Sequence, residues 1–399
     1  MKLILNIILI LIVGCSCHNP EQETDPTPLK AQQKITPGAE RTEEYLHLIK
    51  DRKVGLIVNQ TSTVGSQHLI DHLVDKGINV VRIFTPEHGF KGDADAGEKI
   101  DNCGETYRSI PIKSLYGDTK QPQKEDVDAV DILMFDIQDV GVRFYTYIST
   151  LHYVMQSSAD YNTPLIVLDR PNPLASYVDG PVLEPEFKSF VGMHPVPVVY
   201  GLTIGEYAHM INGENWLSNN AQSELTVIKV DNYNHHSNYV LPINPSPNLP
   251  NTMAIRHYPS LCFFEGTTVS VGRGTDAPFQ QIGHPDYVSD YTFTPVSGPG
   301  SKYPKHENTQ CAGIDLSRVA PPKSSLDISY LIDFYKSLKS KDKPFFNENN
   351  FFDLLAGSDN LRKMILEGKS EVEIRSLWEP GLLEYKMMRR KYLLYNPAH

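Results

Sequence analysis

An acidic stretch directly follows one of the apolar runs of the chain. After NVVRIF (79–84) comes TPEHGFKGDADAGE, which carries Glu87, His88, Asp93 and Asp95 among glycines and alanines. A turn needs only one or two polar residues, so several carboxylates and an imidazole at this point indicate acid–base chemistry. Glu87 is the first candidate for a catalytic residue, because desolvation beside a proline and a phenylalanine would raise its pKa toward general-acid use.

The same stretch allows other interpretations. Glu87 could instead cap a backbone N–H group, and His88 could either contact a substrate or hold the loop through a hydrogen bond to a carbonyl group. Asp93 and Asp95 have the spacing of metal ligands. No matching cluster of Asp, Glu or His lies nearby in the sequence, which favours a solvated acidic loop. We therefore expect no metal, and a metal-dependent hydrolase built on these four residues is the less favoured alternative.

Polar side chains also follow two later apolar runs. In an open α/β sheet the carboxyl ends of the strands share one edge, and ligands bind in the crevice there. We therefore expect these groups around one pocket, with Asp136 and Asp139 as candidate catalytic carboxylates. An ion pair between either of them and Arg143 is an equally good interpretation, and Asp169 could pair with its neighbour Arg170. The candidates for substrate binding from these runs are Gln138, Arg143, Asp169 and Asn172.

Three further residues are candidates for a site or for its support. Tyr145 follows Arg143 where a helix is expected to start, and an aromatic ring near carboxylates suits stacking on a sugar face, although such rings are as often core residues. Arg273 lies between two glycines, so its guanidinium could bind a ligand carboxylate or tie the loop. Glu206 forms a capping box with Thr203, which explains this carboxylate without catalysis.

The elements that must position these residues form a regular pattern. Near-continuous apolar runs that alternate with helical periodicity predict a parallel sheet covered on both faces. We predict an α/β fold, with a Rossmann-like domain over residues 40–215 and a smaller C-terminal α+β domain over residues 216–399. No GxGxxG motif follows the first strand, so a dinucleotide cofactor is not expected. The runs that read as strands are 53–59, 79–84, 129–136 and 163–169.

The first 39 residues are not expected to belong to the fold. A lysine, a short apolar run and small residues precede Cys15, which resembles the lipobox of a bacterial lipoprotein. We predict a signal peptide over residues 1–14, lipidation of Cys15 and a flexible tether over residues 15–39. An ordinary cleaved signal is the alternative. Because Ser16 rather than Asp follows the cysteine, we expect an exported lipoprotein of the outer membrane and periplasm, anchored through one lipidated residue.

Charge and cysteine spacing exclude other classes of protein. The formal net charge of −11 argues against nucleic-acid binding, which needs a basic face. The other cysteines show neither a CxxC motif nor zinc-ligand spacing, and buried free thiols are expected for most of them. They are Cys17, Cys103, Cys262 and Cys311.

Several motifs of the chain closely resemble the exo-β-N-acetylmuramidase family NamZ. The resemblance runs in one order from about residue 40 to 397, and several motifs are too long to match by chance. They are TPEHGF (85–90), FDIQDVGVRFYTY (135–147), VLDRPNPL (167–174), VDGPVLEPEFKSFVG (178–192), PVVYGLTIGEYA (197–208), PSPNLP (245–250), EGTTVSVGRGTDAPFQQIG (265–283) and RRKYLLY (389–395).

This resemblance implies a fold, an activity and some roles. The expected fold is a Rossmann-like domain joined to a smaller C-terminal domain, with the site in the cleft between them. The expected activity is release of N-acetylmuramic acid (MurNAc) from the non-reducing end of β-1,4-linked peptidoglycan fragments, without a cofactor. The glutamate of the family's cleft falls on Glu87, and the lactyl carboxylate of MurNAc calls for a cation such as Arg143 or Arg273. The second catalytic group stays open among Asp136, Asp139, Asp169, Glu184 and Glu206.

A protein of another class would share many of these features. A lipid-anchored solute-binding protein for cell-wall sugars also has an anchor, two lobes and a cleft. It would not need an acid at its site, so turnover of substrate distinguishes the two hypotheses.

Overall fold

The computed structural model describes residues 33–95, 97–98 and 104–395 of the 399-residue chain. The predicted signal peptide, Cys15 and the greater part of the tether lie outside these residues, as do Cys17 and Cys103. From Ile35 onward the chain forms one compact unit. Within the described residues no helix is both long and apolar enough to cross a membrane.

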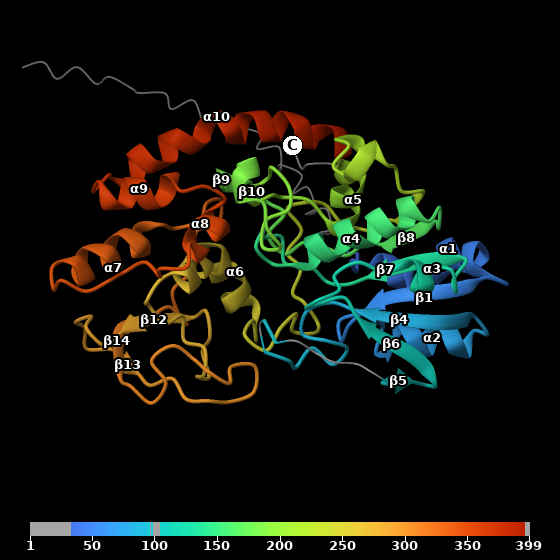
Figure 1. Ribbon diagram of the computed structural model, residues 1–399, viewed down its shortest axis with the longest axis horizontal. Helices are drawn as coiled ribbons and strands as arrows, with labels where there is room; N and C mark the ends of the chain where they lie inside the picture. The colour runs from blue at the N-terminus through green and yellow to red at the C-terminus, as the bar shows by residue number, and fades with distance from the viewer. Residues whose placement is uncertain (1–32, 96, 99–103, 396–399) are drawn as a thin grey trace, which may run out of the picture. The chain divides into compact units, whose positions relative to one another are not determined.

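A seven-stranded sheet organises the first half of this unit (Figure 1). Its pairings are parallel except for the short edge strand β5, which runs antiparallel to β6. The predicted α/β class with a parallel sheet is therefore confirmed. The strands, in spatial order, are β11 (Leu225–Ile228), β8 (Leu165–Leu168), β7 (Ile132–Asp136), β1 (Lys53–Val58), β4 (Asn79–Thr85), β6 (Ile110–Ser114) and β5 (Thr106–Tyr107).

Helices cover both faces of this sheet because successive strand residues point to opposite sides. Leu56 and Val58 pack in one cluster with residues of α1 (Thr42–Ile49) and α2 (Leu69–Asp75). Ile57 points the other way, into a cluster with α4 (Tyr147–Asp160) and α5 (Ile204–Gly213). Figure 1 shows α2 and α4 on opposite sides of the sheet. Burial on both faces explains why the strands read as continuous apolar runs.

The second half of the unit is built from smaller pieces. It contains a three-stranded sheet in the order β12–β14–β13, and β9 pairs with β10. Core residues of α6, α7 and α10 belong to the same hydrophobic cluster as α4 and α5. The elements are β9 (Asp179–Val182), β10 (Pro197–Val199), α6 (Thr252–Leu261), η4 (Cys262–Gly266), β12 (Gln281–His284), β13 (Thr292–Phe293), β14 (Cys311–Asp315), α7 (Ser329–Lys339), α8 (Phe351–Ala356), α9 (Asn360–Leu366) and α10 (Glu371–Arg389).

The structure corrects both ends of the predicted first domain. Strand β11 pairs with β8, so the main sheet extends beyond residue 215. The predicted tether is also too long, because Thr36 bridges Asp231 and the backbone N–H of Gly38 donates to the carbonyl of Asp169 at 2.8 Å. Gly38 and Ala39 are buried. Both errors concern pairings between distant segments, which local sequence patterns do not reveal.

Candidate active site

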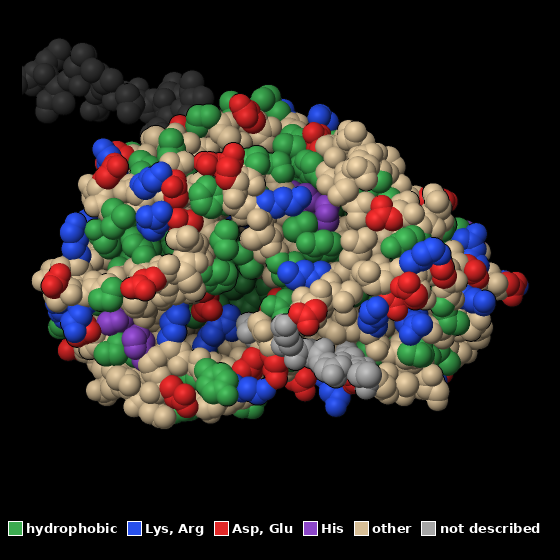
Figure 2. All heavy atoms as spheres, in the orientation of Figure 1, with side chains coloured by type: hydrophobic (Ala, Val, Ile, Leu, Met, Phe, Trp, Pro, Cys, Tyr) green, Lys and Arg blue, Asp and Glu red, His purple; other side chains and the backbone are tan. Residues whose placement is uncertain are grey.

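A pocket of about 460 Å³ lies beyond the carboxyl ends of β4, β6 and β7. Its volume falls within the range of roughly 300–1,000 Å³ that is typical of small-molecule sites. Its lining comes from two parts of the chain, residues 87–191 and residues 246–355. Figure 2 shows a hollow on this face, with hydrophobic side chains inside it and acidic and basic side chains at its edge. Of the predicted site residues, the pocket lining includes Glu87, His88, Tyr145 and Arg273.

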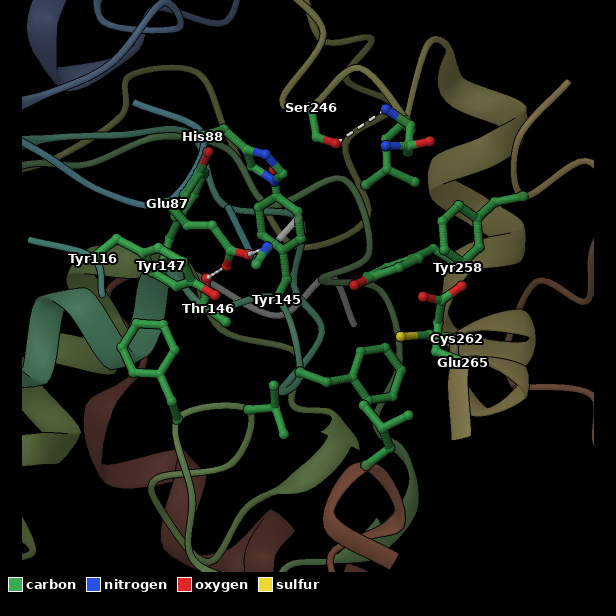
Figure 3. Close-up of a pocket in the computed structure, with 18 of the residues that line it drawn as sticks. Glu87, His88, Tyr116, Tyr145, Thr146, Tyr147, Ser246, Tyr258, Cys262 and Glu265 are labelled. Atoms are coloured by element: carbon green, nitrogen blue, oxygen red, sulfur yellow. Dashed lines mark hydrogen bonds between the residues drawn. The ribbon is translucent and has the colours of Figure 1, made fainter. Parts of the chain in front are cut away.

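Glu87 lies on one wall of this pocket, two residues after β4 ends (Figure 3). The Thr146 hydroxyl donates to its Oε2 at 2.6 Å, and the backbone N–H of Gly97 donates to its Oε1 at 3.0 Å. Burial raises the pKa of Tyr116, and the nearby negative charge of Glu87 raises it further. The carboxylate is thus held by neutral donors, and it makes no ion pair with any described residue.

His88 adopts a backbone conformation that is uncommon for a residue with a side chain, with φ at 67°. Its Nδ1 lies 2.7 Å from the carbonyl oxygen of Ala94. A carbonyl can only accept, so Nδ1 carries the proton and Nε2 is free to accept a hydrogen bond when the ring is neutral. His88 therefore holds the loop, one of the two roles that the sequence left open, and it also lines the pocket, while its contact with a substrate stays a prediction.

Tyrosine rings form much of the wall between the two parts of the chain. The hydroxyl of Tyr145 donates to the carbonyl of Pro245 at 2.9 Å. Its ring meets those of Tyr147 and Tyr258 edge to face, with centroid distances of 4.7 and 6.0 Å. These contacts fix the rings, and burial raises the pKa of all three hydroxyls. Fixed aromatic rings beside a carboxylate suit the binding of a sugar.

The opposite wall carries a carboxylate that the sequence reasoning missed. Glu265 lies in η4, and Arg273 Nε is 3.2 Å from both of its oxygens. Burial alone would raise the pKa of Glu265, but the charges of Arg273 and Lys305 outweigh it and the pKa is lowered. The sequence carried two signals, a single charged residue in the apolar run SLCFFEG and the first position of the motif EGTTVSVGRGTDAPFQQIG, to which no role was assigned. Figure 3 shows Glu265 beside Tyr258 and Cys262, across the pocket from Glu87.

The structure does not bring the strand-end aspartates Asp136 and Asp169 to the pocket, so this prediction is wrong for both. Asp136 forms a buried bidentate ion pair with Arg170, with N–O distances of 2.6 and 2.8 Å. Asp169 accepts from the Thr203 hydroxyl and the Gly205 backbone N–H, both at 2.8 Å. Buried turns beyond strand ends contain backbone and side-chain donors that need acceptors. Asp136 and Asp169 supply these acceptors.

Three more predicted site residues are also held in buried structural hydrogen bonds, one as an acceptor and two as donors. Asp139 accepts from the Gly141 backbone N–H at 2.6 Å and from the Tyr200 hydroxyl, and burial raises its pKa to about 7. Gln138 Nε2 donates to the carbonyl of Pro171 at 2.8 Å. Asn172 Nδ2 donates to the carbonyl of Leu202 at 2.7 Å. None of the three predicted residues lines the pocket.

Arg143 is a structural residue rather than a ligand for substrate. Its fully buried guanidinium donates to four backbone carbonyls at 2.7–2.8 Å. It pairs with neither Asp136 nor Asp139, and burial lowers its pKa to about 9. The four carbonyl groups belong to Pro181, Val196, Leu355 and Ala356.

The two remaining candidates for the second carboxylate are also occupied elsewhere. Glu206 completes the predicted capping box of α5 and lies 2.8 Å from His235. Glu184 is exposed and accepts from Asn360 at 2.9 Å. Neither of them lines the pocket.

The acidic loop after Glu87 docks onto a distant segment. Asp95 accepts from the backbone N–H of Lys302 at 2.6 Å, and the Lys302 ammonium group forms an ion pair with Glu98. Across the described residues, no three His, Cys, Asp or Glu side chains gather as metal ligands would. Asp95 therefore fixes the loop instead of joining Glu87 and His88. Cys262, which lines the pocket, and Cys311 are buried free thiols, as predicted for most cysteines.

The fold and the pocket together define a class of protein. A carboxylate held by neutral donors faces a carboxylate held by cations, across a cavity walled by fixed aromatic rings. This is the arrangement of an α/β protein that binds and hydrolyses saccharides, since glycoside hydrolysis uses two carboxylates in different environments.

Comparisons with known proteins identify the family within this class. Residues 54–253 match the family model described as "Exo-beta-N-acetylmuramidase NamZ, N-terminal", and residues 256–395 match the C-terminal model of the same family. The chain belongs to the NamZ family, as its motifs predicted. It is 36% identical over 376 residues to the peptidoglycan beta-N-acetylmuramidase NamZ of Bacillus subtilis strain 168. This match covers 88% of this chain and 89% of that protein.

Two solved structures from Bacteroides fragilis NCTC 9343 are similar over nearly the whole chain. Both are described as DUF1343 family proteins. The first is 44% identical with a TM-score of 0.83, and the match covers 92% of this chain and 100% of that one. The second is 28% identical with a TM-score of 0.79, and the match covers 91% and 99%.

Proposed function

We propose that this protein is an exo-acting glycoside hydrolase that releases MurNAc from the non-reducing end of β-1,4-linked peptidoglycan fragments. Membership of the NamZ family and the name of the Bacillus subtilis relative support the activity. The alternative of a solute-binding protein has no comparable support. The observation that carries the proposal is Glu87, a carboxylate on the pocket wall that the family motif and the structure both single out.

Glu87 is the general acid in this proposal. Its Oε2 accepts from the Thr146 hydroxyl, and its Oε1 accepts from the Gly97 backbone N–H, so the carboxyl group has a fixed orientation. A proton held there would pass to the glycosidic oxygen as the bond to the leaving sugar breaks. His88 Nε2 and the tyrosine rings would contact the sugar.

The lactyl carboxylate of MurNAc needs a cation, and Lys120 is the best placed. It lines the pocket, with Nζ 4.8 Å from the centroid of the Phe190 ring, and forms no ion pair with a described residue. Arg143 is buried elsewhere. Arg273 lines the pocket but is already paired with Glu265.

The location of the protein is a further part of the proposal. The lipobox-like sequence before Cys15 supports export and lipidation, which would tether the enzyme to the outer membrane on its periplasmic side. This is the compartment in which peptidoglycan fragments form.

The test is release of MurNAc from MurNAc-β-1,4-GlcNAc by the wild type and by Glu87→Gln. Loss of a general acid typically lowers the rate by about 10²–10⁴-fold. We expect MurNAc from the wild type, and a loss of this size in a variant whose melting temperature is unchanged. A wild type that binds the disaccharide without cleaving it would favour a binding protein. Equal cleavage by both proteins would show that Glu87 is not the acid.

A further inference from the structure

The proposed hydrolysis needs a second carboxylate besides Glu87. The candidates from the strand ends are buried in structural hydrogen bonds and do not line the pocket. We propose that Glu265 is this second catalytic carboxylate and acts at the anomeric carbon of the sugar bound between it and Glu87. The inference rests on the proposed function and assigns a residue to its site.

The backbone around Glu265 is fixed from several directions. Lys305 Nζ donates to the carbonyls of Phe264 at 2.7 Å and Glu265 at 3.1 Å. Asn347 Nδ2 also donates to the carbonyl of Glu265, at 3.2 Å. The next residue, Gly266, packs so closely that an added Cβ would lie 2.4 Å from Phe352 Cα. A side chain on so rigid a backbone has the precision that catalysis requires.

The charges around the two glutamates differ in the way that the reaction requires. Glu265 has the Arg273 guanidinium against both oxygens and the Lys305 ammonium nearby, which keep it ionised. Its side chain is nevertheless 21% exposed, so a ligand in the pocket can reach it. Glu87 has a hydroxyl and a backbone N–H as partners. Glu265, as the ionised carboxylate, suits the role of base or nucleophile, and Glu87, which has no cation beside it, suits the role of acid.

A second cavity adjoins the main pocket at Glu265. This cavity of about 260 Å³ shares Glu265 and Arg273 with the main pocket. Its other lining residues include Lys302 and Tyr303, of which Tyr303 is 90% exposed. Glu265 therefore lies at the border of the main pocket, where it can face C1 of a sugar bound there.

The step balances with water as the only co-reactant. Glu87 gives its proton to the glycosidic oxygen, and the breaking C1–O bond leaves its electron pair on that oxygen. Glu265 acts from the opposite face, either by taking a proton from the water that attacks C1 or by forming an ester with C1. In the second case water, deprotonated by Glu87, cleaves the ester. The first route gives the α-anomer of MurNAc and the second gives the β-anomer.

The experiment compares Glu265→Ala, Glu265→Gln and Arg273→Met on MurNAc-β-1,4-GlcNAc, with and without sodium azide. Glu307→Gln is the control, because Glu307 is exposed and lines neither cavity. We expect both Glu265 variants to melt like the wild type and to lose at least about a hundredfold in kcat. Azide should restore cleavage to Glu265→Ala and appear in the product as α-linked MurNAc azide, because the small anion enters where the carboxylate stood.

Other outcomes would overturn the assignment. Activity of Glu265→Gln within about threefold of the wild type would show that this carboxylate does no chemistry. A loss that azide does not restore, matched by Arg273→Met, would make Glu265 a positioning residue for Arg273. Failure of the wild type to release MurNAc would overturn the proposed function itself, and the assignment with it. A folded wild type that releases MurNAc therefore shows that any failure concerns the assignment of Glu265 and not the proposed function.

Discussion

Thr146 shows how one hydroxyl group can orient a carboxylate, that of Glu87, for which we propose a catalytic role. It immediately precedes α4, and its Oγ1 lies 2.6 Å from Glu87 Oε2. A hydrogen bond to a charged group contributes about 1.5–3 kcal/mol, and 1.4 kcal/mol corresponds to a factor of ten. We therefore expect Thr146→Val to lower kcat/KM for the disaccharide by about ten- to a hundredfold. Thr146→Ser, which keeps the donor, should recover most of the activity; equal impairment of both variants would contradict this role.

Arg143 makes a contrasting prediction, because its effect should be on stability. Arg143→Met would remove the Arg143 donor from four buried carbonyls, of which that of Val196 still accepts from the Leu183 backbone N–H, and each carbonyl left without a donor costs about 1–3 kcal/mol. We expect a loss of at least about 3 kcal/mol in the free energy of unfolding, measured in urea. Arg256→Met, at an exposed arginine, is the matched control. A stable Arg143→Met variant with weakened substrate binding would instead restore the sequence-based prediction.

Four of the ten predicted catalytic and binding residues line the pocket, and the reason for the misses lies in the residues themselves. Glu87, His88, Tyr145 and Arg273 line the pocket as predicted. Asp136 and Asp169 resemble Glu87 in sequence, since each of the three lies at the end of an apolar run. Whether a strand-end carboxylate faces a ligand or a buried donor depends on loops from elsewhere in the chain. Glu265 was missed because it lies in a short 3-10 helix, where no strand-end pattern draws attention to it.

At the scale of elements, the turn after β7 is joined to the segment after β10 by Asp139 and Tyr200. Burial raises the pKa of Asp139 from 3.8 to about 7. The folded state therefore holds this proton more tightly than the unfolded state does. The resulting stabilisation is complete below about pH 3.8 and is lost as the pH rises through about 7.

Asp139→Asn removes this titration. Relative to the wild type, the variant should gain stability as the pH rises from about 3.8 to about 7, by up to roughly 1.4 kcal/mol per pH unit, and the difference should level off above pH 7. Asp169, whose pKa burial also raises to about 7, keeps its own contribution in both proteins. Urea unfolding at several pH values measures the difference, with Asp290→Asn at an exposed site as the control. Parallel stability curves for Asp139→Asn and the wild type would contradict the prediction.

At the scale of the whole molecule, the folded unit begins where Thr36 and Asp231 exchange two backbone hydrogen bonds, of 3.0 and 2.8 Å. The backbone N–H of Gly38 adds a third. A chain that begins at residue 35 should therefore keep the activity and melting temperature of the full-length protein, and leave the membrane fraction. A chain that begins at residue 41 also loses the bond from the Tyr45 hydroxyl to the Ala39 carbonyl, so it should lose about 4 kcal/mol of stability, at about 1 kcal/mol for each of the four lost bonds. Equal melting of both shortened chains would contradict this docking.

The sequence predicted the elements that local apolar periodicity determines, and it missed those that depend on pairing between distant segments. Apolar runs alternating with helical periodicity identified β1, β4, β7 and β8 as a parallel sheet. Strand β11 was read as the start of the next domain, because its four residues say nothing about which strand they join. The same limit applies to the N-terminal segment, whose polar composition concealed its pairing with residue 231.

The pocket draws its lining from residues as far apart in sequence as Glu87 and Leu355. This spread determines when activity can appear during synthesis of the protein. A nascent chain that already contains the main sheet and Glu87 still lacks the wall provided by Phe351 and Leu355, so it has no complete site. Release of MurNAc can therefore begin only after nearly the entire polypeptide has been made and folded.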